Sequence, residues 1–178
     1  MRNRTSVAFL ILTVASHKQL GAQSGPVSMY FEGTSQIQLP DGRILPGSAV
    51  LAKRTLNQKT STITEQVISA GSRGRPATEF IVTAKVDGSK FTMTEASGAF
   101  DGDGTLQGPA WQWTGWTSIS RLKEGGRVES IDSATATTLS VHKRVLAADG
   151  TEQVKTTEMF KVVDEARFVA RRKELLPP

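Results

Sequence analysis

The chain has 178 residues, with 22 Lys and Arg, 17 Asp and Glu, two His and no Cys. This length suits a single domain of ordinary size, and a hydrophobic content of 38% is enough to build a core. The lack of cysteine excludes a disulfide framework, a thiolate metal site, a cysteine nucleophile and a lipid-modified cysteine.

The N-terminal segment has the pattern of a secretory signal peptide. Arg2 and Arg4 precede the mostly apolar residues 5–16, and small and polar residues follow. The apolar run is shorter than the roughly 20 residues that span a bilayer, so we expect no transmembrane segment. A buried first strand or helix is the alternative. We predict a signal peptide at 1–23, a single β-barrel domain at 24–178, and a periplasmic or secreted protein.

Removal of the signal peptide changes the charge balance. It takes away three of the 22 basic groups and none of the 17 acidic ones, which leaves a net charge of +2. Nucleic-acid binding needs clustered positive charge, so we expect no nucleic-acid partner. The one basic cluster comprises Arg167, Arg171, Arg172 and Lys173. We expect it to be a solvated face, with contact to an acidic membrane surface or partner as the alternative.

The rest of the chain is a succession of short strands separated by turn signals. In residues 79–86 every second residue from Phe80 onward is apolar, as in a half-buried strand. A turn signal at 87–89 separates this strand from a returning strand at 90–95. Similar turn signals separate three further pairs of expected strands. These pairs are 29–39 with 49–56, 114–122 with 127–134, and 137–147 with 151–163.

The pattern predicts an all-β fold of about ten strands at roughly twelve-residue spacing. Successive hairpins make an antiparallel up-and-down meander, which forms either a closed barrel or a strongly bent sheet. Closure removes exposed edges, and the lack of helices between strands favours an up-and-down barrel over a sandwich. We find no internal repeat, which argues against a propeller. Residues 166–175 are compatible with a strand or a short helix, and we predict a strand.

A Trp-containing strand and two long hairpins follow one another in FDGDGTLQGPAWQWTGWTSISRL (100–122) and GGRVESIDSATATTLSVHKRVLAADGTEQVKTTEMF (125–160). This layout resembles small exported bacterial proteins with a lipocalin-like (calycin) barrel, most of them uncharacterised, over about residues 30–172. The resemblance implies a barrel that holds a small apolar molecule. The Gly-x-Trp of lipocalins is absent from the first strand. Haem-binding relatives use a His as iron ligand, a role that only His142 fits here, and we predict no cofactor.

All three tryptophans, Trp111, Trp113 and Trp116, lie within six residues. In a regular strand Trp111 and Trp113 share a face and Trp116 faces the other way, unless a bulge at Gly115 brings it to the same side. Such a cluster either fills the barrel as core, lines a pocket or forms a partner surface.

Two polar motifs have a weaker link to chemistry. His142 lies opposite the apolar residues of its strand, so we expect it to face solvent unless that face points into a wet lumen. A His–carboxylate site with Glu129, Asp132 or Glu158 stays open, but a lone His is a poor metal constellation and we predict no metal. The Asp-Gly-Asp-Gly of residues 101–104 fails the calcium-loop pattern at its sixth and twelfth positions, and we predict a tight turn there.

We therefore expect a module that binds a small apolar or amphipathic ligand inside the barrel. The residues expected to contact this ligand are Trp111, Trp113, Trp116, Phe80, Phe91, Phe160, Glu95, His142 and Arg144. One alternative is a cofactor-free isomerase, cyclase or hydratase, with His142 or a mid-strand glutamate as general acid or base. Its candidate glutamates are Glu32, Glu65, Glu95, Glu129 and Glu158. The other is a structural or interaction domain without a pocket. No motif identifies a ligand or a protein partner.

Overall fold

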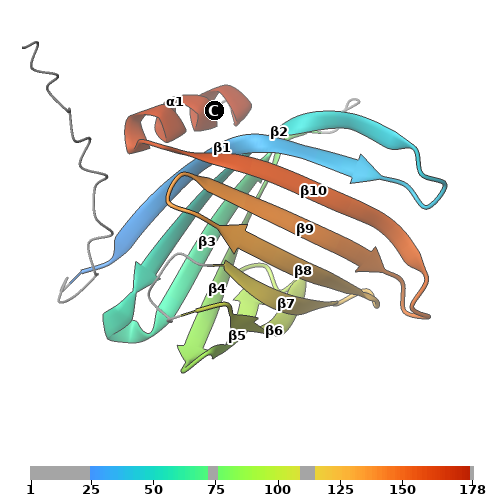
Figure 1. Cartoon of the computed structure of the whole chain (residues 1–178), viewed down its shortest axis with the longest axis horizontal. Helices are drawn as coiled ribbons and strands as arrows, with labels where there is room; N and C mark the ends of the chain where they lie inside the picture. The colour runs from blue at the N-terminus through green and yellow to red at the C-terminus, as the bar shows by residue number, and fades with distance from the viewer. Residues whose placement is uncertain (1–24, 72–75, 109–114, 177–178) are drawn as a thin grey trace, which may run out of the picture.

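The computed structural model describes residues 25–71, 76–108 and 115–176, which form ten strands, one 3-10 turn (Gln58–Thr60) and one helix (Figure 1). The strands are β1 (Val27–Gln38), β2 (Ile44–Asn57), β3 (Thr62–Ser69), β4 (Thr78–Asp87), β5 (Lys90–Glu95), β6 (Phe100–Leu106), β7 (Gly115–Leu122), β8 (Arg127–Ala134), β9 (Thr138–Leu146) and β10 (Glu152–Val163). The helix is α1 (Glu165–Leu175). The expected signal peptide and two of the tryptophans, Trp111 and Trp113, lie outside the described residues.

Each strand pairs antiparallel with the next one along the chain, and the last strand pairs with the first. The β1–β10 seam runs from Tyr30 opposite Val163 to Gln38 opposite Lys155. The ten strands therefore close into an up-and-down barrel (Figure 1). The all-β meander predicted from the turn signals is confirmed, and of its two forms the closed barrel is the one that the chain adopts.

Alternate side chains of the strands fill much of the barrel interior. One buried cluster gathers around Phe31, Leu139 and Phe160, and a second around Ile63 and Phe91. The predicted alternation of residues 79–86 is confirmed, because Val82 and Ala84 are buried and Phe80 packs against both clusters. Burial of this apolar surface stabilises the fold by roughly 25 cal/mol per Å².

The strand predicted at residues 166–175 is wrong, because this segment forms α1. Its residues are mostly good helix formers, and the side chain of Asp164 caps the first turn by accepting a bond from the Arg167 backbone N–H. Phe168 is only 3% exposed because it packs with Leu51 and Ile68. Leu51 and Ile68 lie between the inward-facing residues of β2 and β3, so α1 covers the outer face of the barrel there (Figure 1).

The basic cluster of the C-terminal segment joins α1 to the barrel. Arg167 and Arg171 donate to the carboxylate of Glu32 on β1 at 2.9 and 3.0 Å, and Arg172 donates to Glu79 on β4 at 3.1 Å. These arginines are partly solvated, as expected for a surface face, but acidic residues of the same chain pair with them. Within the described part of the chain, no helix has the length and apolar character needed to cross a membrane.

The tight turn predicted at residues 101–104 is also wrong, because these residues lie inside β6. A Cβ at Gly104 would lie 2.3 Å from the Phe91 ring, and one at Gly102 would lie 2.7 Å from the Met93 side chain. The glycines therefore make room for side chains of β5 rather than reversing the chain. Asp101 and Asp103 are exposed, and both pair with Arg121 on β7.

Candidate functional site

Two hollows lie on opposite faces of the same strands. The first is a cavity of about 210 Å³ in the lumen of the barrel. The second is a more open depression of about 700 Å³ on the outer face of β6 to β10, bordered by the ends of β1 and β2. Most side chains alternate between the two, so that on β7 Ser120 lines the lumen whereas Thr117 and Ile119 line the outer depression. Three residues, Ser118, Ser130 and Lys143, border both hollows.

Aromatic rings from five strands form the apolar wall of the lumen. They are Phe80, Phe91, Phe100, Trp116 and Phe160. The rings of Phe91 and Trp116 lie 5.6 Å apart between centroids, and those of Phe80 and Phe100 lie 6.4 Å apart. These separations are typical of favourable aromatic pairs, so the wall is a packed surface that can contact an apolar ligand.

A buried arginine lies against this wall. Arg54 on β2 is 2% exposed, and its guanidinium carbon is 3.8 Å from the centroid of the Trp116 ring. Its Nε donates to Glu65 on β3 at 2.6 Å, and its Nη2 donates to the buried carboxylate of Asp132 on β8. Ser130 donates to the other oxygen of Asp132 at 2.8 Å. The guanidinium is held in the lumen because it binds two carboxylates and an aromatic face at once.

A second ion pair lies in the same cavity. The Nζ of Lys143 on β9 donates to both carboxylate oxygens of Glu158 on β10, at 2.9 and 3.0 Å. Both side chains are largely buried and line the lumen together with the Arg54 group. The cavity thus combines an aromatic wall with two groups of paired charges, which is an amphipathic lining.

Glu65 has a perturbed acidity in this setting. Burial raises its pKa above the ordinary value of 4.5, and the negative charge of Asp132 raises it further, while the Arg54 guanidinium opposes both effects. The physical cause is that Glu65 and Asp132 share one guanidinium in a poorly solvated space. Glu65 can therefore hold a proton at higher pH than a free glutamate, as a general acid or a neutral hydrogen-bond donor does.

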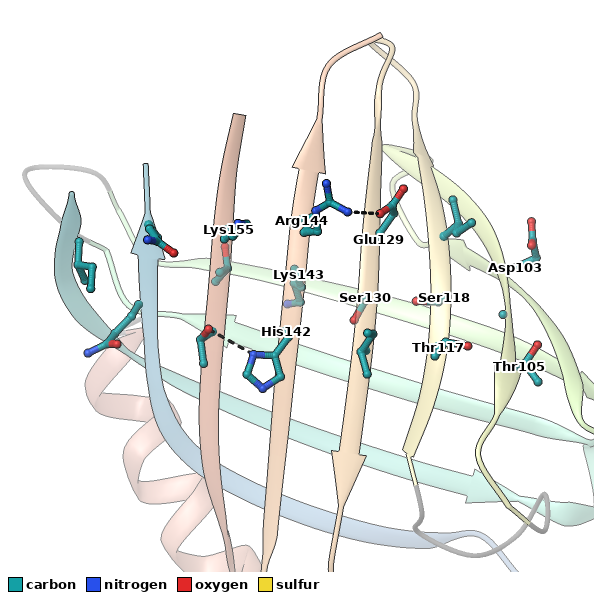
Figure 2. Close-up of a pocket in the computed structure, with 18 residues that line it drawn as sticks. Asp103, Thr105, Thr117, Ser118, Glu129, Ser130, His142, Lys143, Arg144 and Lys155 are labelled. Carbon is teal, nitrogen blue, oxygen red and sulfur yellow. Dashed lines mark hydrogen bonds and ion pairs between the residues drawn. The ribbon is translucent and has the colours of Figure 1, made fainter. Parts of the chain in front are cut away.

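The outer depression is shown in Figure 2 and contains two of the residues predicted to bind a ligand. His142 is exposed and lies 3.4 Å from the hydroxyl of Thr157, and Arg144 pairs with Glu129 at 3.3 Å (Figure 2). The expectation that the His142 face points outward is therefore confirmed. Across the described ranges, no group of three or more His, Asp or Glu side chains is placed to hold a metal ion.

The structure separates the predicted ligand residues into three places. Phe80, Phe91, Phe160 and Trp116 meet in the lumen. His142 and Arg144 line the outer depression instead, because their positions alternate with the inward ones. The carboxylate of Glu95 accepts bonds from the Ser97 and Ala99 backbone at 2.8 and 3.2 Å, so it stabilises the β5–β6 turn. Trp116 lies on the same face of β7 as Ser118 and Ser120, and it lines the lumen. The bulge suggested at Gly115 would set Trp116 relative to Trp111 and Trp113, which lie outside the described residues.

Sequence reasoning missed the two lumen cations, Arg54 and Lys143. A local signal for them exists, since each interrupts an apolar stripe of alternate residues. Arg54 lies between Ala52 and Leu56, and Lys143 between Val141 and Val145. A charge at an inward position of a strand marks a side chain that must find a partner inside. Of the glutamates proposed as lumen groups, Glu65 and Glu158 line the cavity, whereas Glu32 and Glu129 form outward ion pairs.

No protein-family model and no curated protein matches the sequence. The closed ten-strand barrel is compatible with a lipocalin-like architecture, although lipocalin barrels have eight strands. Membership of that family stays a prediction.

Proposed function

We propose that the barrel binds a small amphipathic molecule in its lumen, in the manner of a lipocalin-like carrier. The observation that carries this proposal is the cavity of about 210 Å³ between the aromatic wall and the ion-paired Arg54 and Lys143 groups. A protein that used its barrel only as a scaffold would gain stability by filling this space, because empty volume in a core costs packing energy.

The size of the cavity limits the ligand. Pockets for drug-sized molecules measure about 300–1,000 Å³, and an engineered apolar cavity of about 150 Å³ binds benzene. A lumen of about 210 Å³ therefore suits a molecule of about one ring with a short substituent. Its apolar part would contact the aromatic wall, and its polar group would face the paired charges.

Native mass spectrometry of the protein isolated from its own cells tests this proposal. We expect a bound compound of low mass that is lost in the Ser120→Phe variant, because the new ring occupies the lumen. The matched control is Ile119→Phe, whose ring extends from the neighbouring position into the outer depression and leaves the compound bound. Melting curves of both variants check that they fold. A compound retained by Ser120→Phe, or lost only in Ile119→Phe, would contradict a lumen site.

We also propose that the protein acts in the periplasm or outside the cell. The support is the basic start and the apolar run of residues 5–16, which fit an export signal. N-terminal sequencing of the protein from a periplasmic or culture fraction should find a chain that begins close to residue 24. A chain in that fraction that still begins at Met1 would overturn this part of the proposal.

A second candidate function is a cofactor-free isomerase, cyclase or hydratase in the same lumen. The observation that favours it is the raised pKa of Glu65, a carboxyl beside an aromatic cavity that can take up and release a proton. His142, the other general acid or base considered, lies on the outer face and does not line the lumen. Conversion of the copurified compound by the intact protein, abolished in Glu65→Gln with binding retained, would favour the enzyme over the carrier.

A further inference from the structure

The charges of the lumen are unequal in number. Among the described residues that line it, the cations are Arg54 and Lys143, and the carboxylates are Glu65, Asp132 and Glu158. With all five groups ionised, the cavity has a net charge of −1. This balance is opposite in sign to that of a site for a fatty acid or another carboxylate, where a cation would be in excess.

Both cations are also already engaged. Arg54 donates to Glu65 and Asp132, and Lys143 donates to both oxygens of Glu158. A carboxylate ligand would have to displace one of these carboxylates and leave it buried without a partner. Such a displacement is costly, because an uncompensated buried charge loses its hydration without gaining a counter-ion.

A ligand ammonium meets the opposite situation. Glu65 shares the Arg54 guanidinium with Asp132, so the three carboxylates of the cavity are paired with only two cations. The ammonium supplies that cation and donates hydrogen bonds to carboxylate oxygens, which are strong when both groups are charged. The aromatic wall contributes a second attraction, since ring faces attract cations.

We infer that the lumen binds a small primary amine with an apolar body of about one ring, in preference to the carboxylic acid of the same size. This inference rests on the proposed function and names its ligand class. Burial and the charge of Asp132 raise the pKa of Glu65, which agrees with it, because the cavity favours an added positive charge beside this carboxyl. An ammonium bound there lowers the pKa of Glu65 again, so binding of the amine releases more protons as the pH falls toward that pKa.

Isothermal titration calorimetry on the intact protein tests the inference with three compounds that share a phenyl body. These are 2-phenylethylamine, 2-phenylethanol and phenylacetate, which present a cation, a neutral hydroxyl and an anion. At pH 7 we expect the amine to bind at least tenfold more tightly than phenylacetate, with the alcohol between them. Titrations from pH 7 downward, in buffers of different ionisation enthalpy, should show proton release that grows as the pH falls with the amine and none with the alcohol.

Glu65→Gln removes the excess charge and should bring the affinity for the amine down to that for the alcohol and abolish the proton release. Glu129→Gln, the same change on the outer face of β8, should leave both unchanged.

If Glu65→Gln fails to fold, the order of affinities and the proton release measured on the wild type still test the preference for the amine. Phenylacetate bound as tightly as the amine would overturn the inference. If phenylacetate or the alcohol binds and Ser120→Phe blocks it, the lumen site stands without the amine preference. If no compound binds at millimolar concentration, both proposals fall.

Discussion

Arg54 is the residue on which the interior of this barrel most depends. It belongs to β2, yet it bonds Glu65 on the neighbouring strand and Asp132 on β8, across the lumen. The face of its guanidinium lies over the Trp116 ring. One side chain thus links two walls of the barrel and is the shared counter-ion of two carboxylates.

Replacement of Arg54 by Met should destabilise the protein by about 3–5 kcal/mol, because it leaves buried carboxylate charge without a counter-ion. Urea unfolding at pH 7 measures the change. The matched control is Arg121→Met on the outer face, whose partners Asp101 and Asp103 are exposed, and its cost should be far smaller, because solvent screens exposed ion pairs. Adding Glu65→Gln and Asp132→Asn to the Arg54 variant should restore much of the loss. Equal costs for the two single variants would contradict this role for Arg54.

Among the secondary-structure elements, α1 differs most from the expectation drawn from its sequence. Alternation of apolar and polar residues is a weak guide in a ten-residue segment that has only one face to bury. Two features favour the helix. The side chain of Asp164 caps its first turn, and Phe168 covers the apolar patch around Leu51 and Ile68. The patch belongs to β2 and β3, which lie far earlier in the chain.

Glu32→Gln tests how firmly α1 is attached. The hydrogen bonds from Arg167, followed by the positive charges of Arg167 and Arg171, hold the pKa of Glu32 below its ordinary 4.5 against the effect of burial. A lowered pKa in the folded state stabilises the protein above the unfolded pKa, and this stabilisation is lost as the pH falls through the folded value. The variant should therefore lose about 1–2 kcal/mol at pH 7 and almost nothing in strong acid.

The measurement is urea unfolding of the wild type and the variant at several pH values from 7 downward. The control is Glu124→Gln in the exposed β7–β8 turn, which should change little at any pH. A destabilisation by Glu32→Gln that is independent of pH would show that the carboxylate acts by packing rather than by its charge.

Over the whole molecule, closure is the property that defines this protein. The β1–β10 seam satisfies the backbone groups that two edge strands would otherwise expose. Gly33 allows the strands of this seam to meet, because a Cβ at this position would lie 2.1 Å from the carbonyl oxygen of Met159 on β10. The seam is therefore sensitive to a single methyl group.

Gly33→Ala should weaken the seam and destabilise the protein by about 1–3 kcal/mol, the usual cost of forcing extra volume into a packed site. Hydrogen exchange should become faster for the amides of β1 and β10 than for those of β4 and β5. Gly25→Ala, whose Cβ meets nothing within 4 Å, serves as the control. Uniform acceleration of exchange in all strands would contradict a local role at the seam.

Most strands were predictable because their causes are local. Alternating apolar residues and Asp-Gly or Gly-Gly turns lie within a few positions of one another, so the positions of Lys90–Glu95 and Arg127–Ala134 follow from the chain itself. The alternation also predicted the outward face of His142 and the inward face of Phe80. The Asp-Gly-Asp-Gly segment misled because its glycines make room for Phe91 and Met93 on the preceding strand, β5, rather than forming a turn.

The composition and order of residues along the chain thus established the all-β class, the succession of antiparallel hairpins and the two faces of most strands. Closure, the position of α1 and the meeting of Arg54 with Asp132 needed the folded molecule. The physical reason is distance along the chain: Arg54 and Asp132 are 78 positions apart, and the register of the strands between them decides whether their charges meet or remain unpaired.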